Sequence, residues 1–372
     1  MLGQATFLIL FASDPSVPSV RPHLLRHRIN GMKSKLLPLV LAFVTLPSIA
    51  QSRDLKVFFI DVEGGQSTLF VTPTGQSLLI DTGWPEHEAR DAERIAAAAR
   101  QAHLSRIDYV LITHFHADHV GGVPQLVARI PVGTFLDHGT NRETADKSAS
   151  AGFAAYQAVL AKGASKHITM KVGDKLPITG IDATVISSDG NLLATPLPGA
   201  GQLNPFCQTS EMRPADVTEN ARSLGILIRF GGLKILDLGD LTWDKEMQLM
   251  CPANKLGHID IDIVSHHGWY QSSSPALVHA IAPRVAIMDN GAKKGGSTPA
   301  LKTFATSPGL ETLWQIHYSE EGGPDNNTAD KYIANPQGPD AGLGLELTVS
   351  RNGSFEITNP RTKSTTKYAA KK

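Results

Sequence analysis

The chain has 372 residues, of which 41% are hydrophobic and 19% are charged. This length and composition predict a globular protein of one large or two modest domains with a substantial core. Lysine plus arginine equal aspartate plus glutamate at 35 each, so the formal net charge is zero. That balance excludes the global basic field of many nucleic-acid binders, although a local basic patch remains compatible with it.

The first apolar run has the pattern of an export signal. Residues 32–50 contain two lysines, an apolar stretch from Leu36 to Leu46 and a small-x-small cleavage site that ends at Ala50. We interpret residues 1–31 as an over-extended start and residues 32–50 as a signal peptide that begins at Met32. This predicts a periplasmic or secreted protein without a membrane span after cleavage, and the alternative is a retained membrane anchor.

The two cysteines of the chain bear on the same question. Cys207 and Cys251 are the only cysteines in the sequence. In an oxidising compartment they can form one disulfide, and the alternative is a pair of unpaired buried thiols. The sequence alone leaves both possibilities open, because a disulfide requires a specific geometry.

From residue 51 onward, short β-rich runs alternate with helical patterns, which predicts a mixed α/β domain. We expect antiparallel strands at 55–62, 67–73 and 77–83, a helix at 86–102, a strand at 107–113, a short helix at 123–130, a strand at 132–139 and a helix within 140–165. Residues 189–216 are rich in proline and glycine and predict a long surface loop. Further strands follow at 223–232, 233–240, 261–268 and 284–291, with a helix at 243–250.

Two halves of similar make-up suggest two packed sheets with helices outside, and the polar, basic residues 361–372 suggest a disordered tail. Several apolar runs end in a polar, potentially ligating side chain, namely Asp81, His114, His138, Asp240 and the pair His266 and His267. If these strands lie in two facing sheets, their ends converge on one edge. That edge would be crowded with imidazoles and carboxylates.

The segment 114–119, His-Phe-His-Ala-Asp-His, carries the strongest signal. In an extended segment His114 and His116 point to the same side, while Asp118 and His119 follow where the chain bends toward a helix. This arrangement can present two nitrogen ligands to one cation, and an oxygen and a nitrogen to a second cation. The spacing predicts a dinuclear metal site, because so many clustered polar groups are costly unless something binds them.

These motifs resemble those of metallo-β-lactamase-fold hydrolases. The similarity comprises Asp81 in Leu-Ile-Asp-Thr-Gly, the H-x-H-x-D-H motif, Asp240 after a glycine and His267 before a glycine, and it covers about residues 55–290. Within that superfamily the chain most resembles the soluble domain of ComEC-type DNA-uptake proteins. The resemblance implies an αββα sandwich, which we assign to residues 51–360, with two metal ions at one edge, usually Zn²⁺, with Mn²⁺ as an alternative.

The resemblance also implies roles for individual residues. His114 and His116 would bind the first metal, Asp118, His119 and His267 the second, and Asp240 would bridge them, with Asp81 behind a ligand and His266 as an alternative to His267. The third ligand of the first metal is not evident; His138, His167 and Asn220 are the candidates, and His138 is favoured because it closes a strand. Residues 63–67, Glu-Gly-Gly-Gln-Ser, replace the Gly-Gln-Gly-Asp typical of the ComEC group, so DNA is not implied as the substrate.

The expected activity is hydrolysis of a phosphoester or phosphodiester by a hydroxide that bridges two divalent cations, with Asp118 and Asp240 as the key carboxylates. Lys293 and Lys294 lie in a glycine-rich loop where they could hold a phosphate, although such a loop can also be merely solvated. The expected partner is a small-molecule or phosphoester substrate, and the neutral charge gives nucleic acid no support. Two alternatives remain, namely a β-lactam, amide or ester hydrolase on the same metals, and a secreted binding module without turnover.

Overall fold

The computed structural model describes residues 54–371. The predicted start at Met32 and the predicted signal peptide therefore lie outside the described residues. Among the described helices, none combines the length and the apolar character that crossing a bilayer would require.

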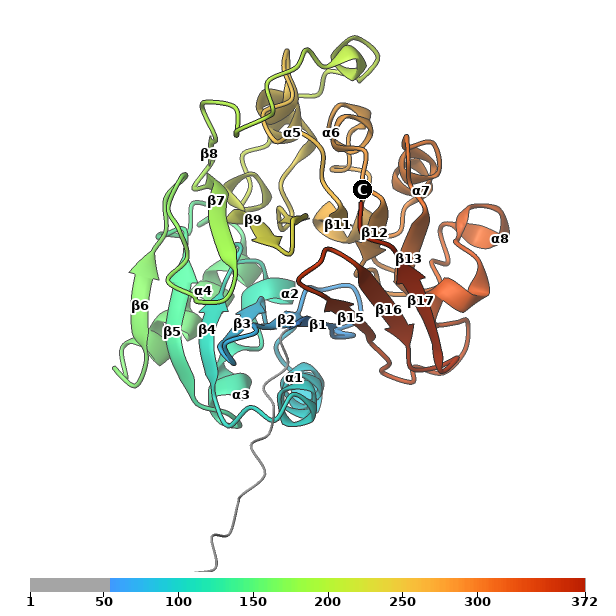
Figure 1. Ribbon diagram of the computed structural model, residues 1–372. Helices are drawn as coiled ribbons and strands as arrows, with labels where there is room; N and C mark the ends of the chain where they lie inside the picture. Colours follow the sequence, from blue (N-terminus) through green and yellow to red (C-terminus); the bar gives the residue numbers. More distant parts are fainter. Residues whose placement is uncertain (1–53, 372) are drawn as a thin grey trace, which may run out of the picture. The chain divides into compact units, whose positions relative to one another are not determined.

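The described residues form two β-sheets. The first contains β1 (Leu55–Phe59), β2 (Thr68–Val71), β3 (Ser77–Ile80), β4 (Ile107–Leu111), β5 (Val132–Asp137), β6 (Lys166–Thr169), β15 (Leu345–Val349), β16 (Phe355–Asn359) and β17 (Ser364–Tyr368). The second contains β7 (Asp182–Ser188), β8 (Asn191–Leu192), β9 (Gly225–Phe230), β10 (Leu233–Asp237), β11 (Ile261–Ile263), β12 (Val285–Met288), β13 (Thr312–His317) and β14 (Ile333–Asn335). The strand orders are β17-β16-β15-β1-β2-β3-β4-β5-β6 and β14-β13-β12-β11-β10-β9-β7-β8 (Figure 1).

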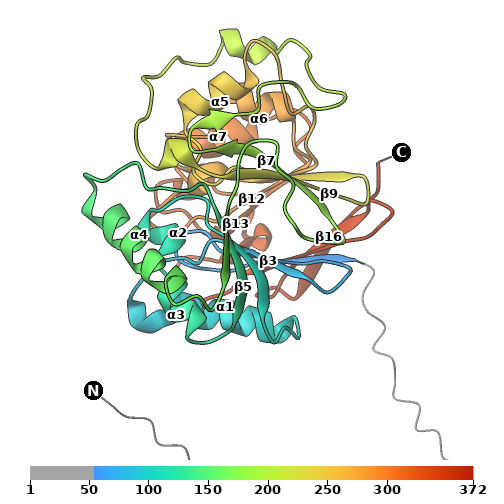
Figure 2. The same cartoon turned by 90° about the vertical axis from the view of Figure 1, so that its left-hand side faces the viewer.

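The two sheets share one core, and helices cover their outer faces. The helices are α1 (Arg90–Gln101), α2 (Ala117–Val120), α3 (Val123–Val127) and α4 (Lys147–Leu160), then α5 (Trp243–Met250), α6 (Pro275–Ile281), α7 (Thr298–Ala305) and α8 (Gly323–Asn326). Figure 2 shows α1, α3 and α4 on one side of the sheets and α5, α6 and α7 on the other. The architecture is an αββα sandwich, which is the fold that the resemblance to metallo-β-lactamase-fold hydrolases implied.

Strand β9 illustrates why whole apolar runs form these sheets. Ile226 and Ile228 belong to the core between the sheets, whereas Leu227 packs in the cluster that includes Leu249 of α5 and Leu277 of α6. Because successive side chains point to opposite faces and both faces are covered, the three consecutive positions 226–228 are all apolar. The periodicity that marks half-exposed strands is therefore absent here.

The order of parallel strands brings the polar strand ends together. Strands β3, β4 and β5 are parallel neighbours, and so are β10, β11 and β12. The carboxyl ends of parallel strands lie at the same edge of a sheet, where α/β proteins commonly place their sites. Asp81, His114 and His138 follow the first set, and Asp240 and His266 follow the second.

The prediction of a disordered tail at residues 361–372 is wrong for most of that segment. Residues 364–368 form β17, which pairs antiparallel with β16 and is one edge strand of the first sheet. The Tyr368 ring stacks on Phe355 with centroids 4.5 Å apart, and its hydroxyl accepts a hydrogen bond of 3.0 Å from Trp314 Nε1. An edge strand needs few buried side chains to stay paired with its neighbour. One aromatic residue in a polar run is therefore sufficient to order β17.

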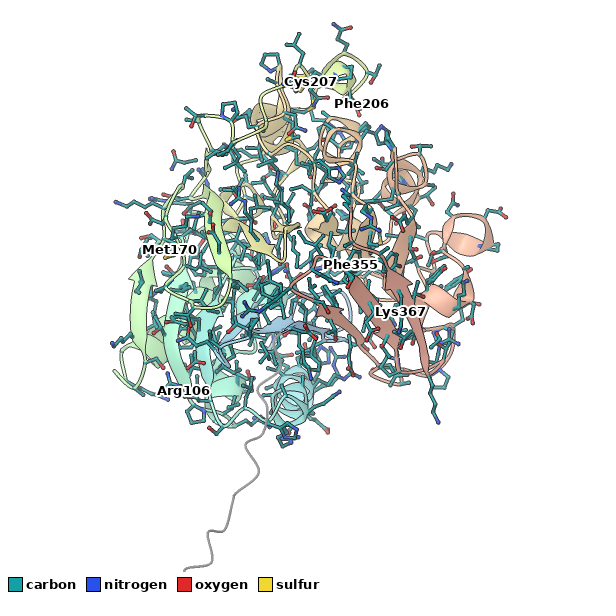
Figure 3. All side chains as sticks on the ribbon, viewed as in Figure 1. Arg106, Met170, Phe206, Cys207, Phe355 and Lys367 are labelled. Carbon is teal, nitrogen blue, oxygen red and sulfur yellow. A yellow bond between two sulfur atoms is a disulfide. The ribbon has the colours of Figure 1, made fainter. Side chains whose placement is uncertain are left out.

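The open question about the cysteines has an answer in the structure. Cys207 and Cys251 form a disulfide, and Figure 3 shows Cys207 beside Phe206 in the long loop. The loop between β8 and β9 follows the prediction, since it contains only short 3₁₀ turns at Pro205–Gln208 and Asn220–Arg222. The disulfide ties this loop to the residue that follows α5.

Candidate metal centre

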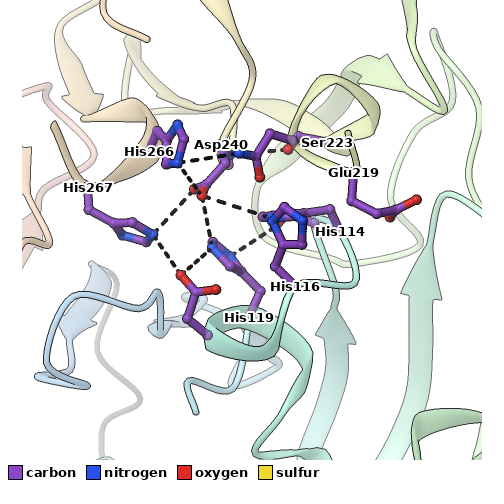
Figure 4. Close-up of polar contacts among 12 residues, drawn as sticks. His114, His116, His119, Glu219, Ser223, Asp240, His266 and His267 are labelled. Carbon is purple, nitrogen blue, oxygen red and sulfur yellow. Dashed lines mark hydrogen bonds and ion pairs between the residues drawn. The ribbon is translucent and has the colours of Figure 1, made fainter. Parts of the chain in front are cut away.

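The H-x-H-x-D-H motif runs from the end of β4 into α2. Two residues separate β4 from His114, and His116 has extended backbone angles at the position just before α2. The start of α2 then turns Asp118 and His119 toward the inside, where both are buried. This bend brings the rings of His114, His116 and His119 close to Asp240 (Figure 4), and Asp118 lies beside His119.

One group of ligand atoms is tightly assembled. Asp118 Oδ2 lies 3.3 Å from His119 Nε2 and 3.3 Å from His267 Nε2. Asp240 completes the group, with Oδ2 at 3.2 Å from His119 Nε2 and Oδ1 at 3.5 Å from His267 Nε2. One ligand atom from each of the four residues lies within 4.8 Å of all the others.

A second group adjoins the same aspartate. His114 Nε2 lies 3.1 Å from His116 Nδ1 and 3.9 Å from Asp240 Oδ2. His266 Nε2 lies 3.4 Å from that same oxygen of Asp240. The carboxylate of Asp240 therefore contacts both groups, which is the position that a bridging ligand requires.

The other candidates for a third ligand lie apart from this centre or at its margin. His138 Nε2 pairs with Glu219 Oε2 at 3.0 Å, and His167 Nε2 pairs with Asp137 Oδ2 at 2.7 Å. The preference for His138 thus finds no support in the geometry, because closing a strand brought its ring to a buried carboxylate instead. Asn220 Nδ2 lies 3.4 Å from His266 Nε2, at the margin of the cluster.

The structure also separates the two lysines. The Lys294 ammonium donates a hydrogen bond to Asp118 Oδ2 and another, of 2.6 Å, to the carbonyl of Gly64. Lys293 is exposed and lines a different cavity of about 750 Å³ with His317. The expectation that both lysines bind one phosphate therefore holds at most for Lys294.

Four of the five imidazoles have a hydrogen-bond partner on their outer side, and the fifth, His267, faces the Asp289 carboxylate there without a hydrogen bond. The pairs are His114 Nδ1 with Thr113 Oγ1 (3.1 Å), His116 Nε2 with Glu143 Oε2 (2.9 Å), His119 Nδ1 with Asp81 Oδ2 (2.7 Å), His266 Nδ1 with Ser272 Oγ (3.3 Å) and His267 Nδ1 with Asp289 Oδ1 (3.3 Å). Metal-ligating histidines characteristically have such an outer partner, which leaves the other ring nitrogen for the metal. In all five rings the other nitrogen faces the centre. It is Nδ1 in His116 and Nε2 in the other four histidines.

Three atoms at the centre are buried without a hydrogen-bond partner. They are His119 Nε2, His267 Nε2 and Asp240 Oδ1. Buried polar atoms are nearly always satisfied, so unpaired atoms that face one point indicate a ligand there. Imidazole nitrogens and carboxylate oxygens are suitable ligands for divalent cations such as Zn²⁺, so the residues present fit a metal centre.

The electrostatics keep the carboxylates ionised. Burial by itself would raise the pKa of Asp118, but Lys294 and His119 outweigh it and hold that pKa well below its usual range. Burial would likewise raise the pKa of Asp240, but His119, His266 and His267 hold it well below the usual range. Burial lowers the pKa of His266 to about 4, so this imidazole is neutral and able to ligate at neutral pH.

Asp81 lies behind His119, on the side of the ring that faces away from the centre. Its Oδ1 accepts the Thr113 N–H at 2.8 Å, and its Oδ2 accepts the Thr113 hydroxyl at 2.6 Å in addition to His119 Nδ1. Gly239, just before Asp240, allows the second sheet to approach closely. A Cβ atom on Gly239, which has φ +56°, would lie 2.8 Å from the Thr113 Cβ.

Sequence reasoning missed three residues around the centre. Glu143 and Glu219 lie in loops, and nothing in their sequence context distinguishes them from solvated glutamates. Asp289 follows β12 directly, so the same strand-end signal that identified Asp81 could have identified it. Its carboxylate faces the outer nitrogen of His267.

Comparison with known proteins gives the family. The family model of the metallo-β-lactamase superfamily matches residues 61–202. The competence protein ComA of Neisseria gonorrhoeae is 24% identical over 269 residues, which cover 72% of this chain and 32% of ComA. A hydroxyacylglutathione hydrolase of Stenotrophomonas maltophilia is 38% identical over 63 residues, 17% of this chain and 21% of that protein.

Further similarities cover a short segment or have low identity. The lactamase-like protein vrtG of Penicillium aethiopicum is 41% identical over 69 residues, 18% of this chain and 21% of vrtG. Among solved structures, the metallo-β-lactamase fold protein YhfI of Bacillus subtilis has a TM-score of 0.42 at 13% identity, covering 70% of this chain and 95% of YhfI. The chain spans no more than about a third of the length of the curated relatives named here. The family model that matches residues 61–202, the αββα sandwich and the clustered H-x-H-x-D-H motif together support a metallo-β-lactamase-fold superfamily member.

Proposed function

We propose that this chain is a dinuclear metal-dependent hydrolase that cleaves a phosphoester or phosphodiester. The observation that carries the proposal is the position of Asp240, whose carboxylate contacts the ligand nitrogens of both groups. Within the superfamily that the chain resembles, such a bridging aspartate is typical of phosphodiesterase-like and thioester-hydrolase-like branches. The coarser statement, a superfamily hydrolase fold with a candidate metal site, rests on the family model and the geometry.

The assignment of ligands follows the distances. His114 and His116 would hold the first ion, with His266 against the same Asp240 oxygen, and Asp118, His119 and His267 would hold the second. Two bound divalent ions, Zn²⁺ or Mn²⁺, would supply Lewis-acid activation of water and of a substrate oxygen. The contacts with Asp118 favour His267 over His266 for the second group.

The residues of the chain would orient this centre and attract the substrate. Asp81 accepts the Nδ1 proton of His119 and so directs the Nε2 lone pair to the centre. The side chain of Lys294 is 36% exposed, so its ammonium is accessible beside Asp118. A cation at this position favours an anionic substrate, which supports a phosphoester over a neutral ester.

The test measures metal content together with hydrolysis of bis-(p-nitrophenyl) phosphate. We expect about two metal ions per chain and turnover that is lost in Asp118→Ala and Asp240→Ala. Asp325→Ala, which removes an exposed carboxylate, is the matched control. Metal binding without phosphodiester or phosphomonoester turnover would contradict the proposed substrate class.

A second candidate is hydrolysis of an ester or thioester on the same centre. Two relatives favour it by name, the hydroxyacylglutathione hydrolase above and an atrochrysone carboxyl ACP thioesterase of Aspergillus fumigatus, which is 40% identical over 67 residues. Parallel assays with a thioester and a chromogenic cephalosporin would separate acyl and β-lactam substrates from phosphoesters. Metal without turnover of any of these compounds would favour the non-catalytic binding module.

We also propose that the protein is exported to the periplasm or secreted. The signal-like pattern of residues 32–50 supports this, and so does the Cys207–Cys251 disulfide, because disulfides persist mainly in oxidising compartments. Mass spectrometry of the exported chain should find a mature start at Gln51. A mature chain that retains residues 1–31 would contradict the proposal.

A further inference from the structure

Glu143 contacts the outer nitrogen of His116. Its Oε2 lies 2.9 Å from His116 Nε2, while Nδ1 of the same ring lies 3.1 Å from His114 Nε2 at the centre. An ionised carboxylate can only accept a hydrogen bond, so this contact places the ring proton on Nε2. The lone pair of Nδ1 then points toward the first group of ligands, beside His114 (Figure 4).

The loop before α4 holds Glu143 in place. Its backbone N–H donates to Asn141 Oδ1 at 2.8 Å, and its carbonyl accepts from the backbone N–H of Asp146 at 3.2 Å. Its Oε2 also accepts the backbone N–H of Glu219 at 2.8 Å. The carboxylate therefore has a defined position before it meets the imidazole.

Glu219 holds the backbone of the same H-x-H pair. Its fully buried carboxylate accepts the N–H of Phe115, the residue between the two histidines, at 3.3 Å. It also accepts His138 Nε2 at 3.0 Å and the N–H of Arg142 at 2.6 Å. Glu143 and Glu219 thus act on one short segment, the first on a ligand ring and the second on its backbone.

His116 needs such support more than the other rings do. Its side chain is 23% exposed, whereas those of His114 and His119 are fully buried. Packing therefore restrains the His116 ring least. Among the described contacts, Glu143 is the sole hydrogen-bond partner of His116 Nε2.

We propose that Glu143 is a positioning residue of the metal centre, which fixes the ring and the tautomer of His116 and so sets the affinity of the first ligand group for its ion. The inference rests on the proposed dinuclear centre and adds a residue that the sequence motif does not contain. It assigns the loop between β5 and α4 a role in metal retention. Glu219 supports the same role by ordering both Glu143 and Phe115.

The test compares the full chain with Glu143→Ala and Glu143→Gln, with Glu88→Gln as the matched control because Glu88 is exposed. Zn²⁺ affinity is measured for each ion by competition with a chromophoric chelator. We expect Glu143→Ala to weaken one of the two ions by about 10- to 100-fold and to leave the other within about twofold. Glu143→Gln should have a smaller effect, because its amide oxygen still accepts the Nε2 proton.

A second readout separates positioning from general support of the fold. The His116 Nε2 proton signal in ¹⁵N-labelled, Zn²⁺-loaded protein should be protected in wild type and lost in Glu143→Ala. If each ion binds Glu143→Ala as tightly as it binds wild type, the proposal is overturned and the dinuclear centre stays intact. If the substitution weakens both ions by the same factor, the proposal is also overturned. A wild-type chain that binds no Zn²⁺ would overturn the centre and this inference together, whereas two tight ions without phosphoester turnover would refute only the proposed substrate.

Discussion

Replacement of Glu246 tests which of two opposing effects controls the pKa of a buried carboxyl on α5. Glu246 lies on α5, is fully buried and accepts the backbone N–H groups of Ser273 and Ser274 at 2.8 and 2.7 Å. These two donors favour the charged form, whereas burial disfavours it. Burial prevails and raises the pKa of Glu246 from 4.5 to about 7.

The sign and size of the effect follow from this pKa. Between pH 4.5 and 7 the folded state retains a proton that the unfolded chain has released, so the free energy of unfolding falls as pH rises through this window. The difference of the two pKa values corresponds to about 3 kcal/mol. Glu246→Gln removes the titration but turns an amide NH2 group toward one of the two backbone N–H donors, which costs stability equally at every pH. The stability of the variant relative to wild type should therefore rise by about 3 kcal/mol from low pH to above pH 7.

Urea unfolding of the metal-free protein from pH 4 to 8 measures this difference. Subtraction of the two curves cancels the titrating groups that do not interact with Glu246. Asp262 is an exception, because its pKa is raised by burial and also by the charge of Glu246. A glutamine side chain is isosteric with the native glutamate, so the Glu246→Gln variant should keep the same fold and the same slope with urea. A stability difference between the two proteins that stays constant from pH 4 to 8 would show that the two backbone donors offset burial, and it would refute the reasoning.

Three further outcomes follow from the contacts. Asp81→Asn should lower metal affinity by about 10- to 100-fold, because an amide N–H facing Nδ1 of His119 moves the ring proton to the metal-facing nitrogen; chelator competition measures this. Tyr368→Ala should destabilise the fold by about 3 kcal/mol by removing the ring that stacks on Phe355, and equal urea midpoints would contradict this role of β17. Cys207→Ser should cost about 4 kcal/mol, given the sequence separation of 44 residues between the two cysteines, and calorimetry checks it.

The strand-end rule explains which parts of the site could be predicted. His114, Asp240 and His267 each follow a buried strand, and the parallel order of those strands brings their ends to one edge. His138 obeys the same rule, yet its ring turns to Glu219. The end of a strand determines where the backbone of a residue lies. The contacts of its side chain also depend on residues of loops that are distant in the sequence.

Glu143 illustrates the part that could not be predicted. It belongs to a polar loop, and only the folded chain shows that its carboxylate meets His116. The disordered-tail prediction failed for a related reason, because the partners that hold Tyr368 are Phe355 and Trp314, the latter 54 residues earlier in the chain. Composition describes a segment alone, whereas order in an edge strand or a loop depends on its partners.

The distribution of ligands between the two sheets has an energetic consequence. The segment 114–119 extends from the first sheet, whereas Asp240 and His267 extend from the second. A metal ion bound by both would therefore link the two halves of the sandwich and exist only in the folded state, so its binding free energy adds to stability. At a free metal concentration of about 100 times Kd, the gain is about 2.7 kcal/mol per ion. Because Asp240 contacts both ligand groups, Asp240→Ala should abolish this gain for both ions, whereas Glu143→Ala should reduce it for one.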